Sequence, residues 1–180
     1  MLTYNRLLVI LEEKSYLFSL NRQSEVYKDP YLITKFNTCL NPTAVGWLIS
    51  RKERNVAIVP DQKENRVQIY DSVNTDNIHI FEIKETPSII TANLYGDVFA
   101  VADSKGLSIK IYNLNDGSFL NEYSRGIDSA QINWIAFEKY WRRMAVTSNK
   151  ETVHCFTLPK EWSEQIIDGI ASFTFSSLFF

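Results

Sequence analysis

A strand motif recurs in this chain at a nearly constant interval. The segments "VQIYDS", "IKIYNL" and "VHCFTL" place Tyr70, Tyr112 and Phe156 in equivalent positions, separated by 42 and 44 residues. About ten residues before each aromatic lies a short run of small apolar residues, "VAIV", "FAVA" or "MAVT". A period of about 40–45 residues built from four short strands is typical of WD-type β-propellers. The spacing therefore predicts an all-β chain arranged in blades.

The repeat also fixes how much of a propeller the chain can form. An earlier copy, "LLVILEEKSYLFSL", places Phe18 52 residues before Tyr70, and the extra length falls in "KDPYLITKFNTCLNP". Since closed propellers have about 4–8 blades, we expect a partial propeller whose end blades have open edges. It occupies residues 1–160, with blades at about 5–28, 43–84, 87–124 and 129–160, and a tail follows at 161–180.

Composition limits the classes of function. The net charge of −2 gives no overall basic field, so we expect no nucleic-acid partner. Cys39 and Cys155 lie in apolar runs without metal-ligand spacing, which favours buried free thiols. No signal peptide or spanning apolar segment is visible, and a cytoplasmic protein is expected. The absence of a Gly-rich phosphate loop, a nucleophile with a placed base or a metal-ligand cluster indicates no enzyme, cofactor or metal site.

The blade sequences resemble the PROPPIN family. The similarity is carried by "NRLLVILEEKSYLFSL", "NPTAVGWLIS", "VFAVADSKGLSIKIYNLNDGSFLNEYSRG" and "RRMAVTSNKETVHCFTLP". An arginine-glycine end to one blade followed by "TVH" in the next is rare in ordinary WD-type repeats. The resemblance implies a seven-bladed propeller that binds phosphoinositides in autophagy and in endosomal or vacuolar traffic. This chain would supply about three and a half to four of the seven blades.

In that family, two arginines at a blade border each face a phosphoinositide pocket. The resemblance places Arg125 in the second pocket, because a guanidinium binds phosphate oxygens with a rigid fork of donors. Thr152 and His154 lie two residues apart on one strand and so share a face. Each residue also has a structural alternative, since Arg-Gly can close a hairpin and Ser or Thr can stabilise turns. The expected pocket comprises Arg125, Gly126, Thr147, Ser148, Thr152 and His154.

The first pocket departs from the family pattern. The first arginine of the motif is replaced by Ser124, and Asp103 and Leu107 stand where serine and threonine are expected. Lys84 and Lys110 keep some positive charge, but an aspartate repels a phosphate and a leucine donates nothing to it. We expect this degenerate pocket to bind phosphate weakly at most.

The sequence leaves two interpretations open for the tail and two for the function. Trp162, Phe173 and Phe175 suit a membrane-inserting element, whereas the alternation in "SFTFSSLFF" suits a core strand. The leading hypothesis is a peripheral membrane adaptor that binds phosphatidylinositol 3-phosphate or the 3,5-bisphosphate on autophagosomal precursor, endosomal or vacuolar membranes and recruits autophagy proteins. The alternative is a protein-interaction scaffold that has lost lipid binding.

Overall fold

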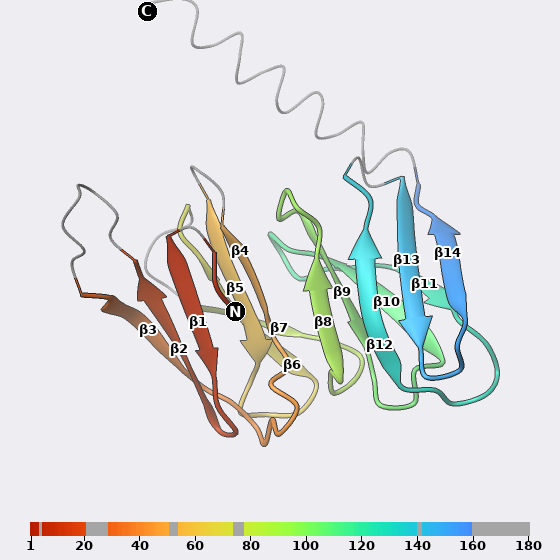
Figure 1. The fold of residues 1–180 in the computed structure, drawn as a ribbon, viewed down its shortest axis with the longest axis horizontal. Coiled ribbons are helices and arrows are strands. Elements are labelled where there is room, and N and C mark those ends of the chain that lie inside the picture. Colours follow the sequence, from red (N-terminus) through yellow and green to blue (C-terminus); the bar gives the residue numbers. More distant parts are fainter. Residues whose placement is uncertain (4, 21–28, 51–53, 74–77, 140–141, 160–180) are drawn as a thin grey trace, which may run out of the picture.

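Four small antiparallel sheets make up the described part of the chain (Figure 1). The computed structural model describes residues 1–3, 5–20, 29–50, 54–73, 78–139 and 142–159, and no helix occurs among them. Each sheet is formed from strands consecutive in sequence, paired with their immediate neighbours. The sheets lie side by side in chain order, as the repeat predicts.

We number the sheets 1 to 4 along the chain. Sheet 1 contains β1 (Arg6–Ile10), β2 (Lys14–Ser19) and β3 (Tyr31–Asn37), and sheet 2 contains β4 (Trp47–Ser50), β5 (Asn55–Pro60), β6 (Arg66–Asp71) and β7 (Ile78–Glu82). Sheet 3 contains β8 (Ile89–Ala92), β9 (Val98–Ala102), β10 (Ser108–Asn113) and β11 (Phe119–Ser124). Sheet 4 contains β12 (Ile132–Phe137), β13 (Arg143–Ser148) and β14 (Val153–Thr157).

The core lies between neighbouring sheets. Every residue of β5 and of β9 is buried, because these strands are covered by a sheet on each face. Alternate residues of one strand therefore belong to different cores: Phe99 and Val101 pack towards sheet 2, whereas Ala100 and Ala102 pack towards sheet 4. This two-sided burial explains why β5 and β9 are almost continuously apolar.

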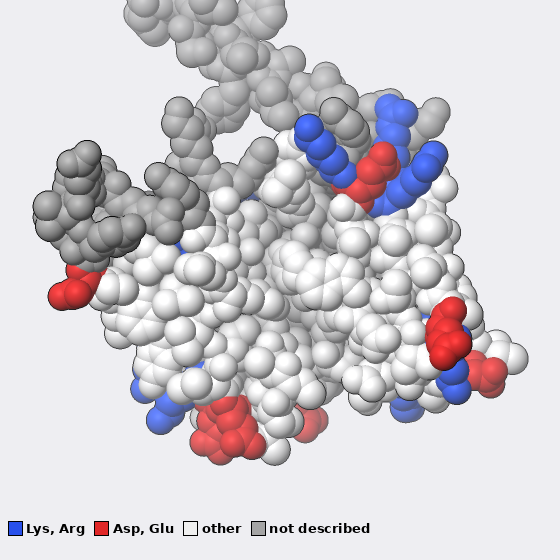
Figure 2. Space-filling view, viewed as in Figure 1, with Lys and Arg blue, Asp and Glu red and all other residues white. Residues whose placement is uncertain are grey.

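The row of sheets is curved. Trp47 on β4 and Trp134 on β12 make an edge-on contact with ring centroids 5.8 Å apart, although sheet 3 lies between their sheets. In a flat stack these two sheets would be about 20 Å apart, since packed sheets are spaced by about 10 Å. The first strands β4, β8 and β12 therefore converge on a common axis, where they line a groove of about 350 Å³. Figure 2 shows that the middle of this face is uncharged and that charged side chains gather around its edges.

Several sequence-based expectations change. The first blade does not end at residue 28, because β3 pairs with β2 and extends sheet 1 to Asn37. The cysteines are free, but Cys155 is exposed and Cys39 is only partly buried. Trp162, Phe173 and Phe175 lie outside the described residues. Within the part of the chain that is described, no helix has the length and hydrophobicity needed to cross a bilayer.

Candidate functional site

Arg125 lies at the seam between sheets 3 and 4. It follows directly after β11, and its backbone N–H donates to the carbonyl of Leu107 at 2.8 Å. Its side chain is folded inward: Nε donates to the carbonyl of Gly106 at 2.7 Å, and Nη2 donates to the carbonyl of Asp128. The residue is 9% exposed. Two backbone segments thus hold the guanidinium in one orientation.

The charge of Arg125 is not cancelled by a carboxylate. Among the described residues, Arg125 forms no ion pair, and its third nitrogen, Nη1, has no hydrogen-bond partner. Carbonyl dipoles orient a guanidinium but leave its full positive charge, so the group retains its attraction for an anion. The arrangement leaves Nη1, with its two N–H groups, and the net charge available for a ligand.

Hydrogen bonds connect the Arg125 region to the end of β13. The N–H of Ala130 donates to the carbonyl of Lys105 at 2.9 Å, which joins the turn before β10 to the segment leading into β12. Gln131 and Asn149 then bond to each other, with Gln131 N donating to Asn149 Oδ1 at 3.1 Å and Asn149 N to Gln131 O at 3.0 Å. The turn after Ser148 therefore lies at the same end of the sheets as Arg125.

The residues after this turn form a small polar cluster. Thr152 Oγ1 and His154 Nε2 lie 3.2 Å apart, as their two-residue spacing predicts. His154 pairs with Val146, whose side chain packs towards sheet 3, so the imidazole is on the face of sheet 4 that adjoins the Arg125 seam. Ser148 is buried, and its hydroxyl accepts from Lys150 N at 3.3 Å.

Thr147 and Gly126 lie outside this polar cluster. Thr147 pairs with Val153, and its side chain is on the face of sheet 4 opposite to that of His154. It therefore does not belong to the cluster. Gly126 continues the turn from Arg125, with its N–H 3.4 Å from the carbonyl of Leu107. No heavy atom lies within 4 Å of where a side chain would begin at Gly126, so that position opens to solvent space.

Lys110 of the degenerate pocket is paired with carboxylates. Lys110 Nζ forms an ion pair with Glu85, and Glu122 lies 3.6 Å away. The Lys110 and Glu85 side chains are 12% and 13% exposed. Burial lowers the pKa of Lys110, but its hydrogen bond and charge contacts with the two glutamates outweigh this and raise the pKa overall. Lys110 is a charged group whose charge is already balanced within the protein.

The other residues of that pocket have structural partners too. Lys84 Nζ lies 3.2 Å from the centroid of the Phe119 ring, in a cation–π contact. Asp103 closes the turn before β10 by accepting from Gly106 N at 2.9 Å. Ser124 is exposed and pairs with Ser108 across β10 and β11. The four residues do not form a cluster of free donors.

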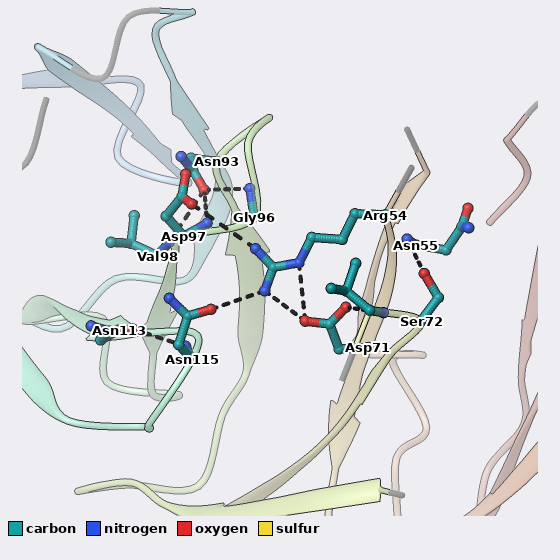
Figure 3. Close-up of polar contacts among 11 residues, drawn as sticks. Arg54, Asn55, Asp71, Ser72, Asn93, Gly96, Asp97, Val98, Asn113 and Asn115 are labelled. Atoms are coloured by element: carbon teal, nitrogen blue, oxygen red, sulfur yellow. Dashed lines mark hydrogen bonds and ion pairs between the residues drawn. The ribbon is translucent and has the colours of Figure 1, made fainter. Parts of the chain in front are cut away.

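A second, partly buried arginine was not singled out from the sequence. Arg54 joins sheets 2 and 3 (Figure 3): it bonds to Asp71 at 2.6 and 3.0 Å, to Asn115 at 3.0 Å, and lies 4.0 Å from Asp97. Asp71 is 3% exposed. This guanidinium is neutralised by carboxylates, in contrast to that of Arg125. Its only sequence signal was a polar residue before a fully buried strand.

No metal site accompanies these features in the described residues, where His, Cys, Asp and Glu side chains nowhere gather in groups of three or more. The polar groups of the Arg125 seam are a cation, hydroxyls and an imidazole. These groups donate to oxygen anions. By its chemistry, this set of groups is suited to an oxygen anion.

Comparisons with known proteins agree with the repeat. The PROPPIN family model matches residues 1–168. "Autophagy-related protein 18" of Aspergillus clavatus is 24% identical over 90% of this chain and 43% of its own length, and that of Yarrowia lipolytica is 28% identical over 87% and 43%. The chain thus spans less than half the length of these relatives.

Solved structures support the same fold. Hsv2 of Kluyveromyces lactis superposes with a TM-score of 0.72 at 15% identity, covering 91% of this chain and 49% of that one. The structure titled as a complex of KlAtg21 with the coiled-coil of AgAtg16 gives 0.68 at 15%, covering 88% and 51%. The predicted partial β-propeller is confirmed. With four blade-like sheets in chain order and a family match along nearly its whole length, the chain belongs to the PROPPIN family.

Proposed function

We propose that this chain binds the phosphorylated inositol headgroup of phosphatidylinositol 3-phosphate or the 3,5-bisphosphate through the seam of sheets 3 and 4. It would act as a peripheral membrane adaptor in autophagy, on autophagosomal precursor, endosomal or vacuolar membranes. The observation that carries the proposal is the guanidinium of Arg125, which is held by two carbonyls and has no carboxylate partner among the described residues. A phosphate at Nη1 would meet a donor that is already oriented, so little ordering is needed on binding.

Neighbouring groups add to this site. Thr152 and His154 supply a hydroxyl and an imidazole on the face of sheet 4 that adjoins the seam. The other pocket offers little, because Lys110 is paired with Glu85 and Lys84 is stacked over Phe119. Binding through one headgroup lacks the gain in effective concentration that two linked sites provide. We therefore expect weak binding that depends strongly on membrane phosphoinositide density.

Liposome flotation tests the proposal. Vesicles of phosphatidylcholine and phosphatidylethanolamine, with or without 5% phosphatidylinositol 3-phosphate (about one lipid in twenty), are mixed with the wild type, Arg125→Ala and Thr152→Val plus His154→Ala. We expect enrichment only on the phosphoinositide vesicles, a loss of about tenfold or more for Arg125→Ala, since charged hydrogen bonds contribute about 1.5–3 kcal/mol, and a smaller loss for the double variant.

Controls separate binding from folding. Arg142→Ala removes an exposed arginine from the other end of sheet 4, so it should float like the wild type. Circular dichroism checks that each variant keeps its strand content. The double variant changes exposed or half-exposed side chains, so it should not disturb folding. Its result therefore does not depend on any structural contribution of the buried Arg125 side chain. Equal flotation of all variants, or flotation that ignores the phosphoinositide, would reject the site.

The second candidate is a scaffold that binds protein partners without lipid. It is supported by the contacts of Lys84 with the Phe119 ring and of Lys110 with Glu85, which engage both lysines within the protein. The solved structure of KlAtg21 is a complex with the coiled-coil of AgAtg16, so a helical coiled-coil is the partner class to test. Retention of such a partner on immobilised protein, together with no flotation on any vesicle, would select this alternative.

A further inference from the structure

Ile127 is the most exposed large hydrophobic residue in the described part of the chain. Its exposed fraction is 96%, whereas no other large hydrophobic residue there exceeds 67%. Single exposed hydrophobic residues are common on protein surfaces and need no explanation by themselves. Ile127, however, lies two residues after Arg125, at the seam of sheets 3 and 4. The two side chains together suit a partner that has both anionic and apolar parts.

The loop that carries Ile127 is held by hydrogen bonds around it. Nη2 of Arg125 donates to the carbonyl of Asp128, so the arginine side chain bridges the residues before and after Ile127. Ala130 N donates to the carbonyl of Lys105 at 2.9 Å, which joins the end of the loop to the turn between β9 and β10. The isoleucine is therefore presented by anchored backbone, and little ordering is needed when it contacts a partner.

The surroundings of Ile127 leave it accessible to a broad surface. A Cβ at Gly126 would meet no heavy atom within 4 Å, so the residue before Ile127 does not shield it. The residues after it, Asp128 and Ser129, are both exposed. An extended partner surface can therefore reach Ile127 without displacing the loop.

Two exposed lysines lie on the turns beside this loop. Lys105 is in the turn between β9 and β10 and Lys150 is in the turn between β13 and β14, and both turns bond to the segment that leads into β12. Lysines beside an apolar side chain are typical of protein surfaces that contact anionic lipid. Asp128 and Glu151 are also exposed and offset this charge, so the apolar contact must provide most of the attraction.

We infer that Ile127 inserts into the bilayer interface beside the bound phosphoinositide headgroup. The inference rests on the proposed lipid site and adds a contact with the acyl region of the membrane. A headgroup bound at Nη1 of Arg125 brings the bilayer surface to the same loop, where Ile127 leaves water, which is favourable for an apolar side chain. A soluble phosphate, in contrast, gains nothing from Ile127. The isoleucine should therefore matter for binding to vesicles and not for binding to the free headgroup.

Flotation and a soluble headgroup separate the two contacts. On the phosphoinositide vesicles, Ile127→Ser should weaken binding about fivefold or more, since fully burying an isoleucine corresponds to roughly tenfold or more in an equilibrium constant. Ile127→Leu keeps the apolar surface and should float like the wild type. In titrations with inositol 1,3-bisphosphate, Ile127→Ser should match the wild type, whereas Arg125→Ala should bind much more weakly.

The matched control is Leu94→Ser. It removes a leucine that is 54% exposed from the turn between β8 and β9, at the opposite end of β9 from Lys105 and its turn. The chemical change is nearly the same as in Ile127→Ser, but the side chain lies away from the seam. This variant should therefore float like the wild type.

A polarity-sensitive dye gives a second, independent readout. Ile127→Cys is labelled with NBD in a background that carries Cys39→Ser and Cys155→Ser, because both native cysteines are free. Leu94→Cys is labelled in the same way. On addition of phosphoinositide vesicles, the emission at residue 127 should rise and shift to shorter wavelength, and that at residue 94 should stay unchanged.

The outcomes distinguish this inference from the proposed function. If Ile127→Ser floats like the wild type while Arg125→Ala does not, or if the dye at residue 127 stays in water, the inference is wrong and the lipid site stands; Ile127 would then be available for a protein contact. If Ile127→Ser weakens binding of the soluble headgroup as much as flotation, the residue acts on the pocket, which also overturns the inference. If the wild type binds neither vesicles nor the soluble headgroup, the proposed function fails and the inference fails with it.

Discussion

Among the described residues, one buried and two partly buried cations are stabilised in different ways. Arg125 is held by the carbonyls of Gly106 and Asp128, which orient the group without cancelling its charge. Arg54 and Lys110 are paired with carboxylates, Asp71 and Glu85. A carboxylate partner stabilises the ion but removes the field that would attract an external anion. The partner, more than the residue type, therefore decides which cation is suited to a ligand.

Removing the Lys110 side chain should destabilise the fold. Lys110→Met leaves Glu85 in a site where its side chain is only 13% exposed and has lost its cation. Breaking a largely buried pair in this way costs about 2–4 kcal/mol. Urea denaturation should detect this loss in the free energy of unfolding. Lys63→Met, which changes an exposed lysine, provides the control and should be almost neutral.

The contribution of Lys110 also has a defined pH dependence. Its pKa is raised in the folded state relative to the ordinary value of 10.5, so the folded protein holds this proton more tightly than the unfolded chain does. The stabilisation is fully present below that value and is lost as pH rises through the folded-state pKa. The difference in unfolding free energy between wild type and Lys110→Met should therefore narrow at alkaline pH, and a difference that widens there would contradict this account.

At the scale of elements, a single turn supports the candidate site. The turn between β9 and β10 contains Gly106 at φ +57°, and a Cβ there would lie 2.0 Å from the carbonyl oxygen of Ala130. Gly106 also provides the carbonyl that binds Nε of Arg125. The close approach of two backbones thus positions the arginine.

Replacing that glycine should damage the seam. Gly106→Ala adds a clash to a left-handed backbone conformation, which alone costs about 1–2 kcal/mol, so we expect a loss of stability above about 2 kcal/mol in urea denaturation. Gly126→Ala, one residue beyond Arg125, meets no atom within 4 Å and should leave stability nearly unchanged. Similar stabilities for the two variants would argue against the backbone contact.

Most strands could be predicted from the sequence, and the exception has a physical cause. The period of the aromatics located β6, β10 and β14, and the apolar runs before them located β5 and β9, which are buried throughout. β3 was missed because only Phe36 of its seven residues is buried, so an outer strand leaves little hydrophobic pattern. Likewise the motif singled out Arg125, but not the carbonyls around it or the role of Glu85, because those contacts join turns and strands distant in sequence.

At the scale of the whole molecule, polar contacts between sheets complement the apolar cores. Arg54 connects Asp71 of sheet 2 to Asn115 and Asp97 of sheet 3 (Figure 3). We call Arg54 and these partners the Arg54 clamp. Because one guanidinium must contact residues of both sheets at the same time, the clamp restricts how one sheet is rotated relative to the next.

Loss of the clamp should lower the stability of the whole chain. Arg54→Met leaves Asp71, which is 3% exposed, without its cation, and we expect a loss of about 2–3 kcal/mol in the free energy of unfolding. Arg66→Met breaks a pair with Glu82, whose side chain is 78% exposed, and should change stability by less than about 0.5 kcal/mol. Thermal unfolding of both variants provides the comparison, and equal effects would show that the clamp adds nothing beyond a surface pair.

The convergence of β4, β8 and β12 has a further geometric consequence. Strands that approach one another at the axis must diverge at the rim, so the space between two sheets is a wedge that widens outward. On β9, one strand out from the axis, Ala100 and Ala102 fit a narrow gap, whereas the wide end requires long, flat side chains. Tyr123 and Phe156, with ring centroids 5.3 Å apart between sheets 3 and 4, fill that width. Aromatic side chains farther from the axis therefore keep neighbouring sheets in contact where the strands diverge.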